Sequence, residues 1–162
     1  SAERKMVGLS ICELLMPLLS RRSDEILLSV LGFLHKLSVF LVNKDAMVKN
    51  AEAMGHLAEL TCHSSADIAL LALRLCYNLS FDPHTRKMLA TQTELVARLV
   101  ATFQLPHFRA VSLKLLYHLS MDSPIRALIS SKHSACVGTF VHLVARGKEQ
   151  HLEREALALS IN

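Results

Sequence analysis

The sequence predicts an all-α protein whose helices repeat and stack into a solenoid, and three observations support this. An apolar stretch ends in Leu-Ser at Leu37-Ser38, Leu79-Ser80 and Leu119-Ser120, and a degraded copy closes the chain. The positions two before each motif serine, and the matching last residue, are 42, 40 and 44 residues apart, a period typical of helical solenoids. Five Gly, four Pro and 5% aromatic residues are too few for an all-β fold. Because solenoids present extended binding surfaces, function becomes a question of partner.

Alignment on the Leu-Ser pair resolves each copy into three helices. Long helices are predicted at 25–40, 67–79, 107–119 and 151–162. Amphipathic helices precede them at 7–19, 50–62, 94–103 and 135–145, and short helices follow three of them at 44–49, 83–90 and 124–130. A short helix followed by two longer ones is the armadillo unit, whereas HEAT repeats have two helices. We therefore predict a right-handed armadillo superhelix of about four repeats with incomplete ends.

The chain is predicted to be a single array and a segment of a longer one. Its approximate repeats are 1–43, 44–82, 83–122 and 123–162. Pro17 lies inside the first apparent helix and predicts either a kink or the start of a shorter helix. Cys76 lies in an apolar column shared with Leu34 and Leu116, which predicts that its side chain is buried.

The short helices have recognisable starts. Asp82 precedes Pro83, and such a carboxylate can accept from the free N–H groups of the first turn while Pro fits the first helical position. The pair Ser123-Pro124 predicts a second start of this kind.

Two Asp/Arg pairs have the spacing of one helical turn. Arg86 follows Asp82 by four residues, and Arg126 follows Asp122 by the same interval. This spacing predicts a weak ion pair within each short helix.

The long helices also carry a polar stripe amid Leu-rich faces. Spacings of seven and four residues keep the stripe on one face, which must be the solvent face because the rest is buried between layers. Equivalent helices of a solenoid stack side by side, so the stripes should form a ladder along a concave groove. The predicted partner-binding residues are Lys36, Arg74, Asn78, Lys114, His118 and Asn162. Their basic character favours an acidic, extended peptide. The alternative for each residue is an ordinary solvated helix face.

Composition and motifs disfavour other classes of function. Mean hydropathy is +0.33, but no stretch reaches the ~20 apolar residues of a membrane span. The nine histidines form no His-Glu-x-x-His motif and the four cysteines no Cys-x-x-Cys pair, so no metal is predicted. Without a Gly-rich phosphate loop or a Gly-x-Ser-x-Gly motif, we predict no enzyme, cofactor or small-molecule substrate. A net charge of +4 with few aromatics disfavours nucleic acid. Scattered cysteines without a signal peptide predict reduced thiols in the cytoplasm.

The residues around the repeated motif are more specific than its period. The informative stretches are Leu34-His35-Lys36-Leu37-Ser38-Val39-Phe40, Asn78-Leu79-Ser80-Phe81-Asp82 and Tyr117-His118-Leu119-Ser120-Met121-Asp122. In order and spacing they resemble successive repeats of the kinesin-associated protein family, the non-motor armadillo subunits of heterotrimeric kinesin-II. The resemblance runs from Leu34 to Asn162, and the links at 62–66 and 104–108 depart from the family pattern.

The resemblance implies an adaptor that binds the tail regions of kinesin-II motor subunits and links cargo proteins for intraflagellar transport. The implied location is the cytoplasm and cytoskeleton, in the cilium or flagellum. The resemblance does not fix which residues contact the tails. The alternative is another armadillo scaffold for an acidic peptide, import-receptor-like or junctional. Import receptors favour Trp four residues before the groove Asn, whereas Arg74 precedes Asn78 here and the chain has no Trp.

Overall fold

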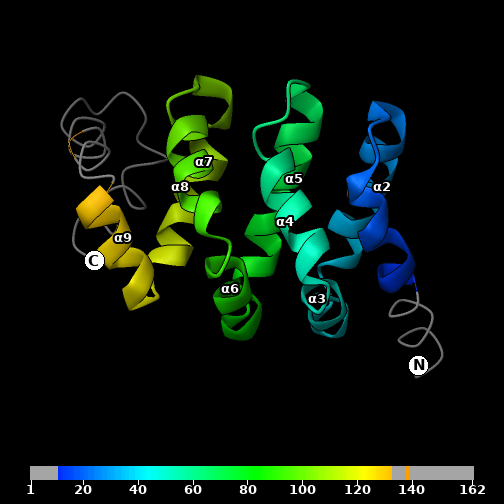
Figure 1. The fold of residues 1–162 in the computed structure, drawn as a ribbon, viewed down its shortest axis with the longest axis horizontal. Coiled ribbons are helices and arrows are strands. Elements are labelled where there is room, and N and C mark those ends of the chain that lie inside the picture. Colours follow the sequence, from blue (N-terminus) through cyan, green and yellow to red (C-terminus); the bar gives the residue numbers. More distant parts are fainter. Residues whose placement is uncertain (1–10, 133–137, 139–162) are drawn as a thin grey trace.

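A computed structural model describes residues 11–132 and residue 138 of the chain. Within this part the chain is helical and contains no β-strand, which confirms the predicted all-α class. The elements are η1 (Met16–Ser20), α2 (Asp24–Leu37), α3 (Leu41–Val48), α4 (Ala51–Leu60), α5 (Ala66–Ser80), α6 (Pro83–Ala90), α7 (Thr93–Phe103), α8 (Pro106–Ser120) and α9 (Ser123–Lys132). Figure 1 shows them succeeding one another along the long axis of the molecule.

Helices of the same kind pack against one another in successive repeats. The long helix α5 packs against both α2 and α8, α4 packs against η1 and α7, and the short helices α3 and α6 are in contact. Figure 1 shows α3 and α6 at the same edge of the molecule. The short-long-long unit is complete twice, as α3-α4-α5 and as α6-α7-α8. The predicted helical solenoid is therefore confirmed.

Helix boundaries differ from the prediction mainly near the first Leu-Ser pair. α2 ends at Leu37 rather than at residue 40, and α3 begins at Leu41 rather than at residue 44. The serine after α2, Ser38, donates its hydroxyl to the carbonyl of His35 at 2.7 Å, which satisfies one carbonyl of the last turn. Phe40 is extended, with φ −95° and ψ 127°, and this turns the chain from α2 into α3.

One of the two predicted starts of short helices, Asp82-Pro83, has the expected geometry. The Asp82 carboxylate accepts from the Thr85 backbone N–H at 2.8 Å, with Pro83 as the first residue of α6. Pro17 lies at the start of the 3₁₀ helix η1, after an α-helical stretch at 11–15, so a shorter helix does begin there. Ser123, expected just before a short helix, is instead the first residue of α9.

The core is a continuous apolar cluster that includes the motif leucines Leu79 and Leu119. Cys76, Leu34 and Leu116 share a repeat position and all three are fully buried, as the apolar column predicted. Burial raises the pKa of the Cys76 thiol to about 12. None of the helices in the described part of the chain is both long and apolar enough to cross a bilayer.

One repeat position is buried in two long helices and exposed in the third. Leu75 and Leu115 are fully buried, whereas Phe33 at the same position of α2 is 58% exposed. Since α8 packs on α5 and α5 packs on α2, we infer that this position faces the preceding long helix. In α2 the side that carries Phe33 is left open to solvent.

Candidate partner-binding surface

The sequence-predicted binding residues lie on the three stacked long helices. Lys36 is in the last turn of α2, Arg74 and Asn78 are in α5, and Lys114 and His118 are in α8. We call the face formed by these five residues the α2–α5–α8 surface. The sixth predicted residue, Asn162, lies outside the described residues.

The five residues differ in exposure. Lys36 and Arg74 are exposed, whereas Asn78, Lys114 and His118 are half-buried. Each pair within a helix is one turn apart, so its two side chains lie on one face. The predicted ladder thus has two exposed cations and three half-buried polar groups.

Asn78 is bound to the preceding repeat. Its side-chain amide donates to the Ser38 hydroxyl at 3.0 Å and lies 3.5 Å from the carbonyl oxygen of His35. The Ser38 hydroxyl uses its own proton on that same carbonyl, at 2.7 Å. The Asn78 amide therefore contributes to holding α5 against the end of α2.

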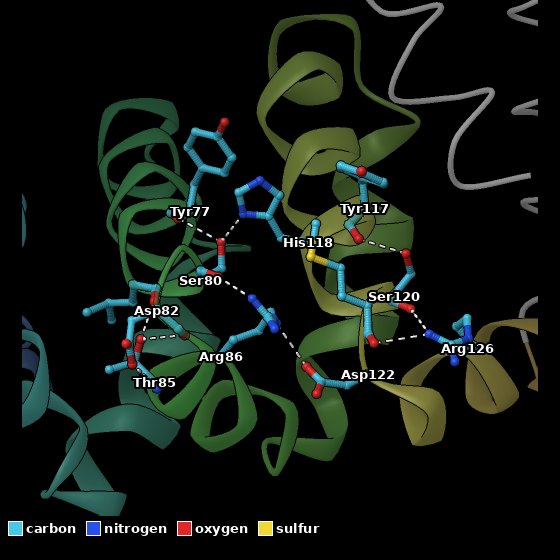
Figure 2. A network of polar contacts seen from close by, with 12 residues as sticks. Tyr77, Ser80, Asp82, Thr85, Arg86, Tyr117, His118, Ser120, Asp122 and Arg126 are labelled. Atoms are coloured by element: carbon cyan, nitrogen blue, oxygen red, sulfur yellow. Dashed lines mark hydrogen bonds and ion pairs between the residues drawn. The ribbon is translucent and has the colours of Figure 1, made fainter. Parts of the chain in front are cut away.

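His118 repeats this arrangement one unit later. Its ring nitrogen Nδ1 lies 2.8 Å from the Ser80 hydroxyl, and that hydroxyl donates to the Tyr77 carbonyl at 2.7 Å (Figure 2). Because the serine proton is already used, Nδ1 must carry a proton and donate to Ser80. Ser120 donates to the Tyr117 carbonyl in the same way at 2.7 Å. The motif serine is thus an acceptor for the next repeat at both junctions.

These serine contacts were not predicted from the sequence, although a signal for them exists. Asn78 follows Ser38 by 40 residues, and His118 follows Ser80 by 38 residues. A polar residue one period after each motif serine is a pattern that the alignment contained. The alignment does not give the axial offset between adjacent helices, and this offset decides whether those two side chains are in contact.

A basic residue six positions after each motif serine forms a second set of contacts. The Arg86 guanidinium donates to the Ser80 carbonyl at 3.3 Å, and that of Arg126 donates to the Ser120 carbonyl at 2.8 Å. Lys44, at the equivalent position, donates to the carbonyl of Asn78 in α5 at 2.6 Å. These cations donate to carbonyls at the C-terminal ends of long helices, where the helix dipole favours a positive charge.

The predicted ion pair within the short helix is wrong for Arg86. Its Nε donates to the Asp122 carboxylate, 36 residues later in the turn after α8, at 3.0 Å, and the two side chains are only 13% and 16% exposed. Asp82 instead caps its own helix at the backbone N–H of Thr85. Figure 2 shows Arg86 extended between Ser80 and Asp122. The reason is that the turn after α8 brings the Asp122 carboxylate to the guanidinium, while the Asp82 carboxylate is engaged at the start of α6.

Arg126 also departs from the prediction of a pair with Asp122. Its guanidinium donates to the carbonyls of Ser120 and Met121 at 2.8 and 3.1 Å. Asp122 is engaged by Arg86 from the preceding short helix. Asp122, which lies between α8 and α9, therefore pairs with α6, whereas Asp82 caps its own short helix.

Local electrostatics on the α2–α5–α8 surface are basic. Burial, reinforced by the positive charge of Arg74, lowers the pKa of His35. Burial also lowers the pKa of Lys44, and the carboxylate of Asp82 partly opposes that shift. α8 contains no Asp or Glu along its length, and the acidic residues of the other two helices lie in their first turns, Asp24 and Glu25 in α2 and Asp67 in α5. A surface of this kind can attract acidic groups of a partner.

Comparisons with known proteins agree with this architecture. The model of the family described as kinesin-associated protein matches residues 1–162. Among curated proteins the comparison found no match to this chain. Among solved structures, the crystal structure of an engineered protein is similar, with a TM-score of 0.79 and 16% identity. The similarity covers 92% of this chain and 60% of the engineered one, and at this identity it shows the fold alone.

Proposed function

We propose that this chain, which belongs to the kinesin-associated protein family, is a non-catalytic adaptor of the heterotrimeric kinesin-II motor. In this role it binds the tail regions of the motor subunits and links cargo proteins to them. The process it serves is microtubule-based intraflagellar transport, in the cytoplasm and on the cytoskeleton of a cilium or flagellum. The observation that carries the proposal is the family match over residues 1–162.

The α2–α5–α8 surface is the proposed site for the motor tails. Lys36 and Arg74 are exposed on it, and Lys114 lies one turn before His118 on the neighbouring helix. Charged groups of this kind steer an oppositely charged partner and fix its orientation. The Asn78 and His118 contacts hold the helices in a fixed relation, which lowers the entropy lost on binding.

A binding assay with the paired kinesin-II tails tests the proposal. The double variant Arg74→Glu/Lys114→Glu should bind the tails about tenfold more weakly or worse, because it places like charge against an acidic segment. Affinity is measured by surface plasmon resonance at low and at physiological salt. The wild-type affinity should fall with rising salt, and the variant should lose most of that dependence.

The matched control is Lys49→Glu/Lys87→Glu, which changes the net charge equally at two exposed positions, Lys49 directly after α3 and Lys87 in α6. It should bind the tails as the wild-type chain does. Circular dichroism must show that both double variants keep their helices. Wild-type affinity in a folded Arg74→Glu/Lys114→Glu chain would exclude this surface, and failure of the wild-type chain to bind any kinesin-II tail would overturn the adaptor function.

A further inference from the structure

Three rings form an aromatic cluster where α5 meets α8. The centroid of Phe81 lies 4.9 Å from that of Tyr77 and 4.6 Å from that of His118, both in edge-on geometry. Tyr77 and His118 are 5.0 Å apart. Figure 2 shows the rings of Tyr77 and His118 close together above the Ser80 hydroxyl. The cluster therefore spans the junction between two repeats.

Phe81 remains largely in solvent although it contacts both rings. Its side chain is 56% exposed, and it is the residue that directly follows the Leu-Ser pair of α5. The equivalent residues of the other two described copies, Val39 and Met121, are 69% and 44% exposed. A large apolar residue is thus exposed at the same position in three repeats. Exposed apolar side chains that recur at the same repeat position indicate a binding surface more strongly than isolated exposed apolar side chains do.

Contacts of Lys44 and Ser80 hold the aromatic cluster in place. Lys44 lies with Nζ 5.8 Å from the centroid of Phe81, and this ammonium is buried and bound to the Asn78 carbonyl. The ring of His118 is fixed by its contact with Ser80. Aromatic anchors that are already ordered lose little freedom on binding, which favours them as energetic centres of an interface.

The charged side chains near the aromatic cluster determine which kind of partner segment it can bind. Arg74 lies one turn before Asn78 on α5, and Lys114 lies one turn before His118 on α8, so both cations are close to the rings along the helix axes. The nearest carboxylates along the chain, Asp82 and Asp122, are turned to the Thr85 backbone and to the Arg86 guanidinium. An apolar centre flanked by cations complements an apolar side chain flanked by acidic residues.

From this arrangement we infer that the partner segment is acidic and carries one large apolar side chain that packs against Phe81, Tyr77 and His118. The inference rests on the proposed function of the α2–α5–α8 surface and names the chemistry of its partner. The acidic residues of the segment lie over Arg74 and Lys114, and its apolar side chain covers the exposed face of Phe81.

Two synthetic probes test the inference without the motor. One is acetyl-Glu-Glu-Phe-Glu-Glu-amide, and the other has Ser in place of Phe. Titrated by nuclear magnetic resonance into the chain, the Phe peptide should bind about tenfold more tightly than the Ser peptide. In Phe81→Ser this preference should disappear, and in Phe81→Leu, which keeps an apolar side chain, most of it should remain.

The matched control is Phe33→Ser, because Phe33 is similarly exposed but lies in α2, outside the aromatic cluster. This variant should keep the full preference for the Phe peptide. The inference is overturned if the wild-type chain shows no preference, or if folded Phe81→Ser retains it. It is also overturned if wild-type chains self-associate through Phe81 in sedimentation experiments, since the occupant would then be a second copy.

A binding assay with the motor tails distinguishes failure of this inference from failure of the proposed function. Tail binding that needs Arg74 and Lys114 but is unchanged in Phe81→Ser would overturn the inference and leave the adaptor function standing. Absence of tail binding by the wild-type chain would overturn the function, while the peptide preference would still decide whether the aromatic cluster accepts an apolar side chain in an acidic context.

Discussion

At the scale of single residues, one serine hydroxyl serves two repeats at each described junction. Ser38 and Ser80 each give their proton to a carbonyl of their own helix and accept from the next long helix. The donors are Asn78 and His118, which have in common an N–H group at the same distance from the backbone. This explains why chemically different residues occupy equivalent places in the repeat.

His35 makes the stability of the folded chain depend on pH. Burial and the charge of Arg74 hold the pKa of His35 below its ordinary value of 6.5, so the unfolded chain binds protons more readily than the folded one. The stability that depends on neutral His35 is complete above pH 6.5 and is lost as the pH falls from 6.5 toward the lower pKa of the folded state. Urea unfolding across this window should show a smaller loss of unfolding free energy in His35→Gln than in the wild-type chain. Equal losses in the two chains would contradict this account of His35.

Sequence reasoning predicted which residues form the polar stripe but not what each of them does. The seven-and-four spacing placed Arg74, Asn78, Lys114 and His118 on one helical face, and they do lie on the stacked long helices. The hydrogen bonds of Asn78 and His118 depend on the offset between neighbouring helices, which side-chain packing determines and the period does not. Whether the stripe binds a partner stays a prediction.

At the scale of elements, the Arg86–Asp122 ion pair ties the short helix α6 to the turn between α8 and α9. Both side chains are mostly buried, and Arg86 also donates to a carbonyl at the end of α5. Replacing Asp122 by Asn should lower the free energy of unfolding by about 1–3 kcal/mol, because Arg86 would then lack its charged partner. The loss is measured by urea denaturation followed by circular dichroism.

A double-mutant cycle distinguishes this pair from the one the sequence suggested. Arg86→Gln combined with Asp122→Asn should show a coupling of at least about 0.5 kcal/mol, and Arg86→Gln combined with Asp82→Asn should show less. The reverse order would mean that Arg86 pairs within its own helix. Helix starts such as Asp82-Pro83 were predictable because their signals are local, whereas the partner of Arg86 lies 36 residues away in the sequence.

At the scale of the whole molecule, burial of a repeat position depends on whether a neighbouring repeat covers it. Leu75 is fully buried and Phe33 is 58% exposed, although both lie five residues before a motif serine. Leu75→Ala should therefore cost about 2–5 kcal/mol of unfolding free energy, and Phe33→Ala less than about 1 kcal/mol. Thermal and urea unfolding of the two variants measure the difference, and equal costs would contradict the stacking order α2, α5, α8.

The all-α class and the solenoid followed from the 40-residue spacing of the Leu-Ser pairs because a repeat imposes one local structure on every copy. The end of α2 at Leu37 was less predictable, since the apolar sequence continues through Val39 and Phe40 into α3. Residues 38–40 separate the two helices, and Phe40 among them has extended backbone. Local polarity gave no signal for that turn.

The central claim is that kinesin-II tails bind the α2–α5–α8 surface. Hydrogen–deuterium exchange of the chain with and without the paired tails tests it most directly. The account predicts slower exchange on binding at the ends of α5 and α8 and in the residues that follow them, around Phe81 and Met121, with α4 and α7 unchanged. Slower exchange confined to α4 and α7, with none at α5 and α8, would contradict it.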